Sequence, residues 1–145
     1  MINVGGANSK VTIISVPTFP QGFTVTELAT DTDPLVIDDI EINNTEVGVN
    51  GDVVSWKKAG LINVELSVIP NTESDKNLKI ILNSNRLAKN KVALDDDITM
   101  IVTESDGTIT TFSGGKLISG PLSNSIGADA KIRTKTYRFT FSNVI

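Results

Sequence analysis

Carboxylates are the side chains of this sequence with the clearest capacity for chemistry, and they occur in two runs. The second run is Asp95-Asp96-Asp97, and the first comprises Asp31, Asp33, Asp38, Asp39, Glu41 and Glu46. Clustered carboxylates bind hard cations such as Ca²⁺. However, neither run follows the D-x-[DN]-x-[DN]-G spacing of a calcium loop, and consecutive aspartates in a strand point to opposite faces. We therefore expect solvated charge here and no metal site.

Catalysis by other routes finds little support in the residue types. A paired-carboxylate hydrolase needs two acids facing one cleft, yet no aromatic-lined sugar cleft is indicated, since Trp56 and Tyr137 are the only residues of their type. With no His and no Cys, the chain has no Ser-His or Cys-His pair and no thiolate or imidazole ligand. Gly114-Gly115-Lys116 lacks the first glycine and the Ser/Thr of a phosphate loop. We expect a protein that is not an enzyme and needs no cofactor.

Composition predicts one folded domain over residues 1–145. Hydrophobic residues make up 39% and charged residues 21%, which allows a core, and no apolar run is long enough to span a membrane. The net charge of −4 argues against general affinity for nucleic acid. Small and polar residues 1–10 lack the pattern of a secretory signal and predict a mobile arm or a segment ordered by a partner.

The pattern along the chain predicts about seven to nine strands and a single helix. Strands are expected over Val11–Val16, Phe23–Leu28, Leu35–Val47, Asp52–Lys57, Leu61–Ile69, Ile98–Thr103, Thr108–Phe112, Lys116–Ser119 and Lys131–Ser142. Pro17, Pro20 and Gly22 predict a loop between the first two strands. Asn50-Gly51 predicts a type I′ hairpin turn, in which both central residues have positive φ. Gly114-Gly115 predicts a bulge or a second bend.

The helix is expected over about Glu73–Lys89, after Pro70 ends the preceding strand. Asn71 or Thr72 is its predicted N-cap, and the acids of the first turn favour the helix dipole. The apolar face consists of Leu78, Ile81, Leu82 and Leu87.

The last predicted strand has an unusual face, because Lys131, Arg133 and Lys135 share it with Tyr137, Phe139 and Phe141. On one interpretation, the aromatic half packs in the core while the basic half projects as an exposed ribbon. On the other, that cationic ribbon contacts an acidic surface of a neighbouring copy, for which the segment containing Asp38, Asp39 and Glu41 is the natural counterpart. Trp56, beside two lysines, is either a core residue or an interface residue.

Residues 46–86 resemble the central segment of the tail tube proteins of contractile-tailed phages and related bacteriocins. The likeness rests on a hairpin tip over residues 48–52, a polar stretch over 55–58 and a V-x-L-x-V strand containing Val64, Leu66 and Val68. A polar turn follows, and then a helix of the L-x-x-I/L type. The segment GGKLISGP at 114–121 and the terminal Tyr137-x-Phe139-x-Phe141 also resemble the closing hairpin of that family.

This resemblance implies a mainly β fold, an antiparallel β-sandwich or half-open barrel with one flanking helix. It also implies a structural virion protein whose hexameric rings stack into the inner tail tube and conduct DNA. The implied partners are the sheath, tape measure and baseplate or terminator proteins, and the implied location is the tail, assembled in the host bacterial cytoplasm. The alternatives are a β-sandwich module that binds carbohydrate or decorates a capsid or fibre, and the tube of a phage-like injection system.

Candidate subunit-interface residues on this interpretation are Val47, Gly48, Asn50, Gly51, Asp52, Trp56, Lys131, Arg133 and Lys135. Acidic candidates for the lumen or for ring-to-ring contacts are Asp38, Asp39, Glu41 and Glu46. Exposed polar strand edges and segments of opposite charge on one chain both favour contact between copies.

Overall fold

The computed structural model describes residues 9–145, so most of the N-terminal segment 1–10, predicted to be mobile or ordered by a partner, lies outside the described residues. In chain order the elements are β1 (Lys10–Val16), β2 (Phe19–Val25), β3 (Leu35–Ile37), β4 (Asn43–Val47), β5 (Val53–Lys57), β6 (Ile62–Val68), α1 (Glu73–Asn85), β7 (Asp97–Thr103), β8 (Ile109–Ser119), β9 (Lys135–Phe141) and β10 (Asn143–Val144).

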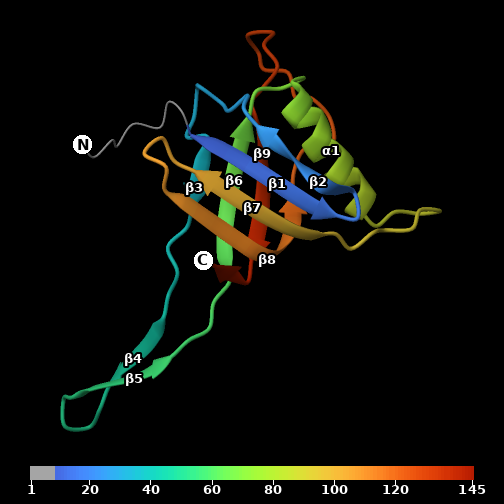
Figure 1. Cartoon of the computed structure of the whole chain (residues 1–145). Helices are drawn as coiled ribbons and strands as arrows, with labels where there is room; N and C mark the ends of the chain where they lie inside the picture. Colours follow the sequence, from blue (N-terminus) through green and yellow to red (C-terminus); the bar gives the residue numbers. More distant parts are fainter. Residues whose placement is uncertain (1–8) are drawn as a thin grey trace.

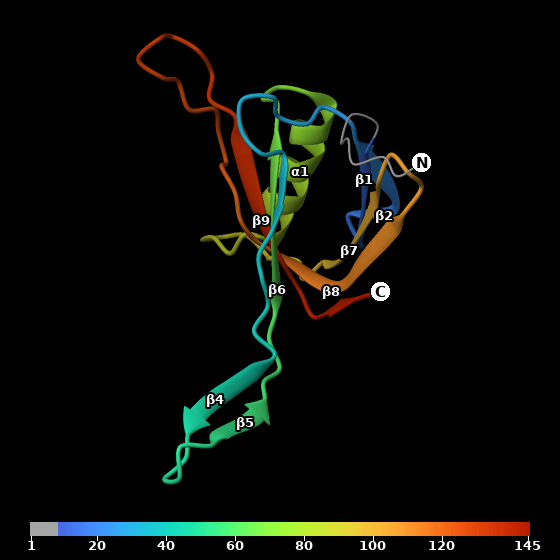
Figure 2. The ribbon, with the colours of Figure 1, turned by 90° about the vertical axis from the view of Figure 1, so that its left-hand side faces the viewer.

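One long sheet forms the body, with the strand order β2-β1-β7-β8-β9-β6-β3 and β10 added to β8. All of its pairings are antiparallel. The sheet folds back on itself at β8, so that β1, β2 and β7 form one half and β9, β6 and β3 the other (Figure 2). The two ends of the sheet do not pair with each other, and residues 9–145 contain one helix, which confirms the predicted antiparallel sandwich or half-open barrel with one flanking helix.

Alternating apolar residues along β6 and β9 build the core. Ile62, Val64, Leu66 and Val68 are buried, and the facing strand contributes Tyr137, Phe139 and Phe141. Because side chains in a strand alternate between two faces, the intervening Asn63 and Arg138 lie on the opposite face and are exposed, whereas Ser67 on that face is buried and hydrogen-bonds to Thr136. The expectation that the terminal aromatic residues belong to the core is confirmed.

A glycine pair allows β8 to pair with β7 in one half of the sheet and with β9 in the other. The register between β7 and β8 shifts between Ile98 and Met100, and Gly114 has a φ of 63°. A Cβ atom on Gly115 would collide with the ring of Phe141 and lie 2.9 Å from the carbonyl oxygen of Ile98. The predicted bulge is therefore present, and it needs the absence of a side chain at Gly115.

The second strand begins earlier than predicted, at Phe19, and ends at Val25. Pro20 lies within it, which is tolerated because β2 is an edge strand and needs no donor on its outer side. Residues 20–22 oppose the single residue Ile14, and Gly22 has a φ of 77° in this irregular stretch. The proline and glycine thus mark a bulged edge, not the predicted loop.

The long strand predicted over Leu35–Val47 is interrupted. The chain leaves the body after β3 and pairs again only in β4, with residues 38–42 outside any strand. Likewise, the last strand begins at Lys135, whereas residues 131–134 lie in the preceding loop.

The helix ends at Asn85, four residues before the predicted end. The side-chain amide of Asn85 donates to the carbonyl oxygen of Ile81 at 2.8 Å, and its Oδ1 accepts from the backbone N–H of Asp96 at 2.7 Å. Arg86 is already extended, with a ψ of 131°. Leu87 is consequently exposed and does not belong to the buried face, which retains Leu78 and Ile81.

A buried ionic cluster holds the start of α1 against β9. Thr72 is the N-cap, and the Asp75 carboxylate accepts hydrogen bonds from Lys135 Nζ at 3.0 Å, Tyr137 Oη at 2.8 Å and the Asn71 N–H at 2.9 Å. Only 4% of Lys135 is exposed. The prediction that Lys135 lies on an exposed ribbon is therefore wrong, because its ammonium group turns inward to a carboxylate 60 residues upstream. Burial, together with Asp75, raises the pKa of Tyr137.

Replacing Asp75 with alanine should lower the free energy of unfolding by about 3–5 kcal/mol, because the Lys135 ammonium would stay buried without a counter-charge. Urea denaturation measures the change. The matched control is Glu65→Ala, which removes the exposed Arg138–Glu65 pair at 3.0 Å and should cost less than about 1 kcal/mol. Equal losses in the two variants would contradict a special role for the buried cluster.

Gly115→Ala should destabilise the body by about 1–3 kcal/mol, because its methyl group overlaps Phe141 and the Ile98 carbonyl. The control is Gly48→Ala, where the nearest atoms to a new Cβ lie at 3.4 Å and the change should stay within about 0.5 kcal/mol. Thermal or urea unfolding of both variants tests the comparison, and a neutral Gly115→Ala would show that the sheet does not depend on this close approach.

Candidate assembly surface

A hairpin stands away from the body and contains most of the predicted interface residues. Residues 38–61, here called the arm, leave the sheet after β3 and return at β6. Figures 1 and 2 both show the arm extending beyond one end of the sheet. Within the described chain, β4 and β5 pair only with each other.

The base of the arm is held by a small set of contacts. Lys58 Nζ lies 2.9 Å from Glu41 Oε2, and this hydrogen-bonded pair lowers the pKa of Glu41. The Lys58 N–H also donates to the carbonyl oxygen of Ile42 at 2.9 Å. Gly60 packs closely on the side chain of Ile40. These contacts align the two segments of the arm, residues 40–42 and 58–60, next to the start of β4 and the end of β5.

The tip is a three-residue loop and not the predicted type I′ turn. The Gly48 N–H donates to the Asp52 carbonyl oxygen at 2.7 Å, and the Gly51 N–H donates to the Gly48 carbonyl oxygen at 2.9 Å. Gly51 has a φ of 84°, whereas Asn50 is not among the residues with positive φ. This pattern is typical of a type I turn followed by a left-handed glycine, the second common way to close a hairpin.

The arm exposes apolar side chains on both of its faces. Val47 and Val53 are register partners with 76% and 74% of their surfaces exposed. Val54 and Trp56 lie on the opposite face, and Trp56 is 49% exposed, so it is not a core residue. The consecutive valines 53 and 54 were the sequence signal for this, since neighbours in a strand cannot both be buried on one face. An isolated two-stranded hairpin is marginal in water, so this surface is suited to being covered.

The acidic candidates lie on the arm, and the basic ones do not. Asp38, Asp39 and Glu41 are exposed near its base, and Glu46 is exposed in β4 opposite Val54. Lys131 and Arg133 are exposed in the loop over residues 122–134, at the opposite end of the molecule (Figures 1 and 2). One copy of the chain therefore does not bring the two predicted sets together.

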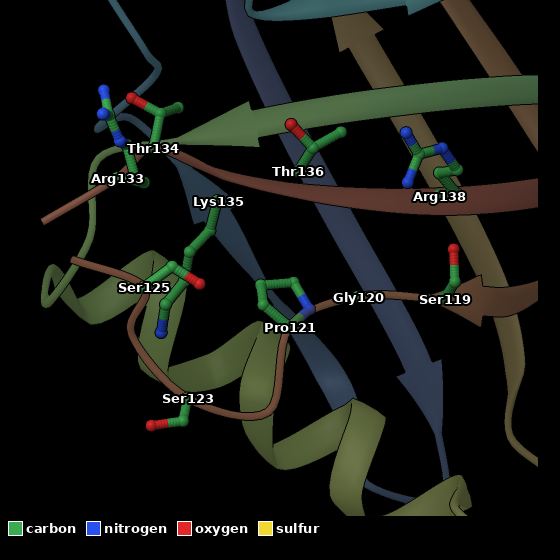
Figure 3. Close-up of a pocket in the computed structure, with 10 residues that line it drawn as sticks. All are labelled: Ser119, Gly120, Pro121, Ser123, Ser125, Arg133, Thr134, Lys135, Thr136 and Arg138. Carbon is green, nitrogen blue, oxygen red and sulfur yellow. The ribbon is translucent and has the colours of Figure 1, made fainter. Parts of the chain in front are cut away.

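The basic loop borders a hollow of about 350 Å³ (Figure 3). Its lining consists of Ser119, Gly120, Pro121, Ser123, Ser125, Arg133, Thr134, Lys135, Thr136 and Arg138. Figure 3 shows Lys135 running toward α1, away from Arg133 and Arg138.

The polar groups around this hollow are largely engaged by carboxylates of the same chain. Arg138 Nε lies 3.0 Å from Glu65, and Thr134 Oγ1 donates to Asp31 at 2.7 Å. Arg133 is more loosely held, at 3.9 Å from Asp129. The lining includes no carboxylate or histidine that could activate its serines. Across residues 9–145, no group of three or more acidic, His or Cys side chains is arranged to hold a metal. No helix in that range is long and apolar enough to cross a membrane.

Comparison with known proteins identifies the family and the fold. Residues 2–145 match the family described as "Tail fiber protein gp32". No curated protein matches the chain. Among solved structures, a chain of the sheath–tube complex of the extracellular contractile injection system PVC in its extended state aligns with a TM-score of 0.58 and 17% identity, covering 99% of this chain and 90% of that one.

Two further structures show the same fold. The PVC sheath/tube terminator aligns with a TM-score of 0.58 and 16% identity, over 100% of this chain and 96% of that chain. The tube-terminating cap of the anti-feeding prophage aligns with a TM-score of 0.55 and 14% identity, over 100% and 91%. The predicted resemblance to tail tube proteins is thus confirmed in the fold. The chain belongs to the tail fiber protein gp32 family and is a structural tail protein with the fold of contractile-system tube chains.

Proposed function

We propose that this protein is a non-enzymatic tube subunit whose hexameric rings stack into a hollow tail tube that conducts phage DNA. The observation that carries the proposal is the arm, an unsupported hairpin with exposed valines on both faces. A hairpin of this kind gains stability only when another surface covers it. A neighbouring copy is the cover that a self-assembling tube provides.

The edges of the sheet favour a directional contact between copies. At one end, β2 carries Pro20 and the bulge around Gly22, which hinder the addition of another strand. At the other end, β3 is short but has no proline, and the arm begins directly after it. A neighbouring strand can therefore extend the sheet at the β3 end, where the arm hairpin would join the inter-subunit sheet.

We assign ring-to-ring contacts to three segments. These are the N-terminal residues 1–10, the tip over 48–52 and the loop over 122–130 with the adjacent exposed Lys131 and Arg133. Lys135 is left out, because it is buried in the chain itself. An acidic protein is suited to line a DNA conduit, because like charge keeps the polymer from adhering.

The proposed partners are the sheath, the tape measure and the baseplate or terminator proteins. Support comes from the solved relatives, which belong to sheath–tube, terminator and cap assemblies. On this proposal the protein is assembled in the bacterial cytoplasm and resides in the tail. The tube of a phage-like injection system would use the same surfaces.

A second candidate function is a fibre or decoration module, which the family description "Tail fiber protein" favours. Such a module would bind glycan or a capsid surface as a discrete unit and would not polymerise. Glycan-array binding by a protein that stays monomeric at high concentration would support it over the tube.

Replacing Val47 and Val53 together with serine should prevent tube formation while the body remains folded, because both side chains point away from the core. Electron microscopy and sedimentation at high protein concentration measure assembly, and circular dichroism checks the fold. The control variant changes Ile109 and Ile145, which are 60% and 82% exposed outside the arm, to serine. Unimpaired tubes from the arm variant, or a wild-type protein that stays monomeric under all conditions, would contradict the proposal.

A further inference from the structure

The charges of this chain are strongly segregated along the sequence. Residues 11–56 contain no Lys or Arg, and their acids are Glu27, Asp31, Asp33, Asp38, Asp39, Glu41, Glu46 and Asp52. Residues 76–94 contain no Asp or Glu, and their cations are Lys76, Lys79, Arg86, Lys89 and Lys91. The modest net charge of −4 thus conceals two regions of opposite sign.

The cations of the second region lie on α1 and on the loop that follows it, a part of the molecule here called the cationic face. Two of them have structural roles at the end of the helix. Lys91 Nζ donates to the carbonyl oxygens of Arg86 at 2.6 Å and Ser84 at 3.4 Å, and Arg86 donates to Asn83 Oδ1 at 3.1 and 3.2 Å. Lys76, Lys79 and Lys89 are exposed and form no ion pair with any carboxylate of residues 9–145.

The same segment also carries exposed apolar side chains. Ile80 is on the helix, and Leu87 and Val92 are in the following loop, all three of them exposed. An apolar centre with a charged rim is the usual composition of a protein–protein interface. The arm has the matching composition with the opposite sign, since the exposed Val54 and Trp56 share one face of the hairpin with Glu46.

The two surfaces do not meet within one copy. The arm extends from the end of the body where β3 ends and β6 begins. Helix α1 lies beside the sheet, away from the arm (Figures 1 and 2). In the described chain, the only carboxylate of the arm with an ion-pair partner is Glu41, which pairs with Lys58. Asp38, Asp39 and Glu46 are exposed without such a partner.

We propose that the arm of one copy docks on the cationic face of α1 in the next copy, with the arm acids opposite Lys76, Lys79 and Lys89. This inference rests on the proposed self-assembly and specifies the contact that drives it. Two different surfaces of the same chain then form a heterologous, head-to-tail contact, which either closes a ring or propagates along a tube. Opposite charge fixes the orientation of the arm, and the valines supply apolar contact.

The cationic loop near residue 131 is a poorer counterpart for the arm. Arg133 already faces Asp129 in its own loop at 3.9 Å, and Lys135 is paired with Asp75 in the interior. Of these three cations, Lys131 alone has an ammonium group without an ion-pair partner in the described chain, and its backbone N–H donates to Asp129 at 3.2 Å. The structure thus moves the expected partner of the acidic segment from the last strand to the helix.

The test is a charge exchange between the two surfaces. The helix variant combines Lys76→Glu, Lys79→Glu and Lys89→Glu, and the arm variant combines Asp38→Lys, Asp39→Lys and Glu46→Lys. Each should raise the protein concentration needed for assembly at least about tenfold, because three attractive pairings become repulsive. A third variant carrying all six changes should assemble near the wild-type concentration, because the charges are complementary again. Light scattering and electron microscopy measure assembly, and circular dichroism confirms that each variant is folded.

A control and a set of opposing outcomes keep the two proposals separate. Glu104→Lys, which reverses an exposed charge in the turn after β7 and outside both surfaces, should assemble at nearly the wild-type concentration. Normal assembly of the helix variant, or loss of assembly in both single-surface variants without recovery in the sixfold variant, would overturn the docking proposal. The cationic face would belong to another partner if the sixfold variant failed to recover assembly and the wild-type helix surface bound an added acidic protein or DNA. That result would also overturn the docking proposal. A wild-type protein that does not assemble would instead refute the proposed function.

Discussion

The fold depends on one buried carboxylate. The sheet is open along one side, and helix α1, which packs there, is fixed at its N-terminus by Asp75, which receives hydrogen bonds from Lys135, Tyr137 and the Asn71 N–H. Removing a carboxylate and an ammonium from water costs several kcal/mol per ion unless each is paired and hydrogen-bonded. The chain satisfies this condition only when β9 begins beside the first turn of α1. That placement sets the register of β9 on β6, and so directs Tyr137, Phe139 and Phe141 into the core.

Because the body completes its own core, the fold does not require the arm. Its strands contribute no residue to the buried cluster, and its valines and Trp56 remain exposed. Apolar residues that do not stabilise the monomer are a liability unless a partner covers them, since exposed hairpins invite non-specific pairing. The acids around the base of the arm moderate that risk, because like charge keeps free arms apart until a cationic surface is available.

Local patterns in the sequence predicted local features well. The alternation of β6, the Thr72 cap and the bulge at Gly115 each depend on a few neighbouring residues, and each is present. The errors arose where a distant contact decided the outcome. Lys135 resembled an exposed residue because its partner lies 60 positions away, and the helix ended at Asn85 because that side chain binds the backbone of Asp96. Pro20 indicated a loop because an edge position cannot be recognised before the strand order is known.

Function, like the distant contacts, cannot be inferred from the fold alone. A fold shared among several kinds of tail component does not by itself decide whether a chain propagates an assembly or ends it, because that depends on its surfaces. A terminating subunit needs only one of two complementary surfaces, whereas a propagating subunit needs both on the same chain. This chain carries an acidic apolar arm and a cationic apolar helix face, at separate places on one molecule. Two such surfaces leave every bound copy with one of them unoccupied, and this favours a repeating tube over a capping or decorating role.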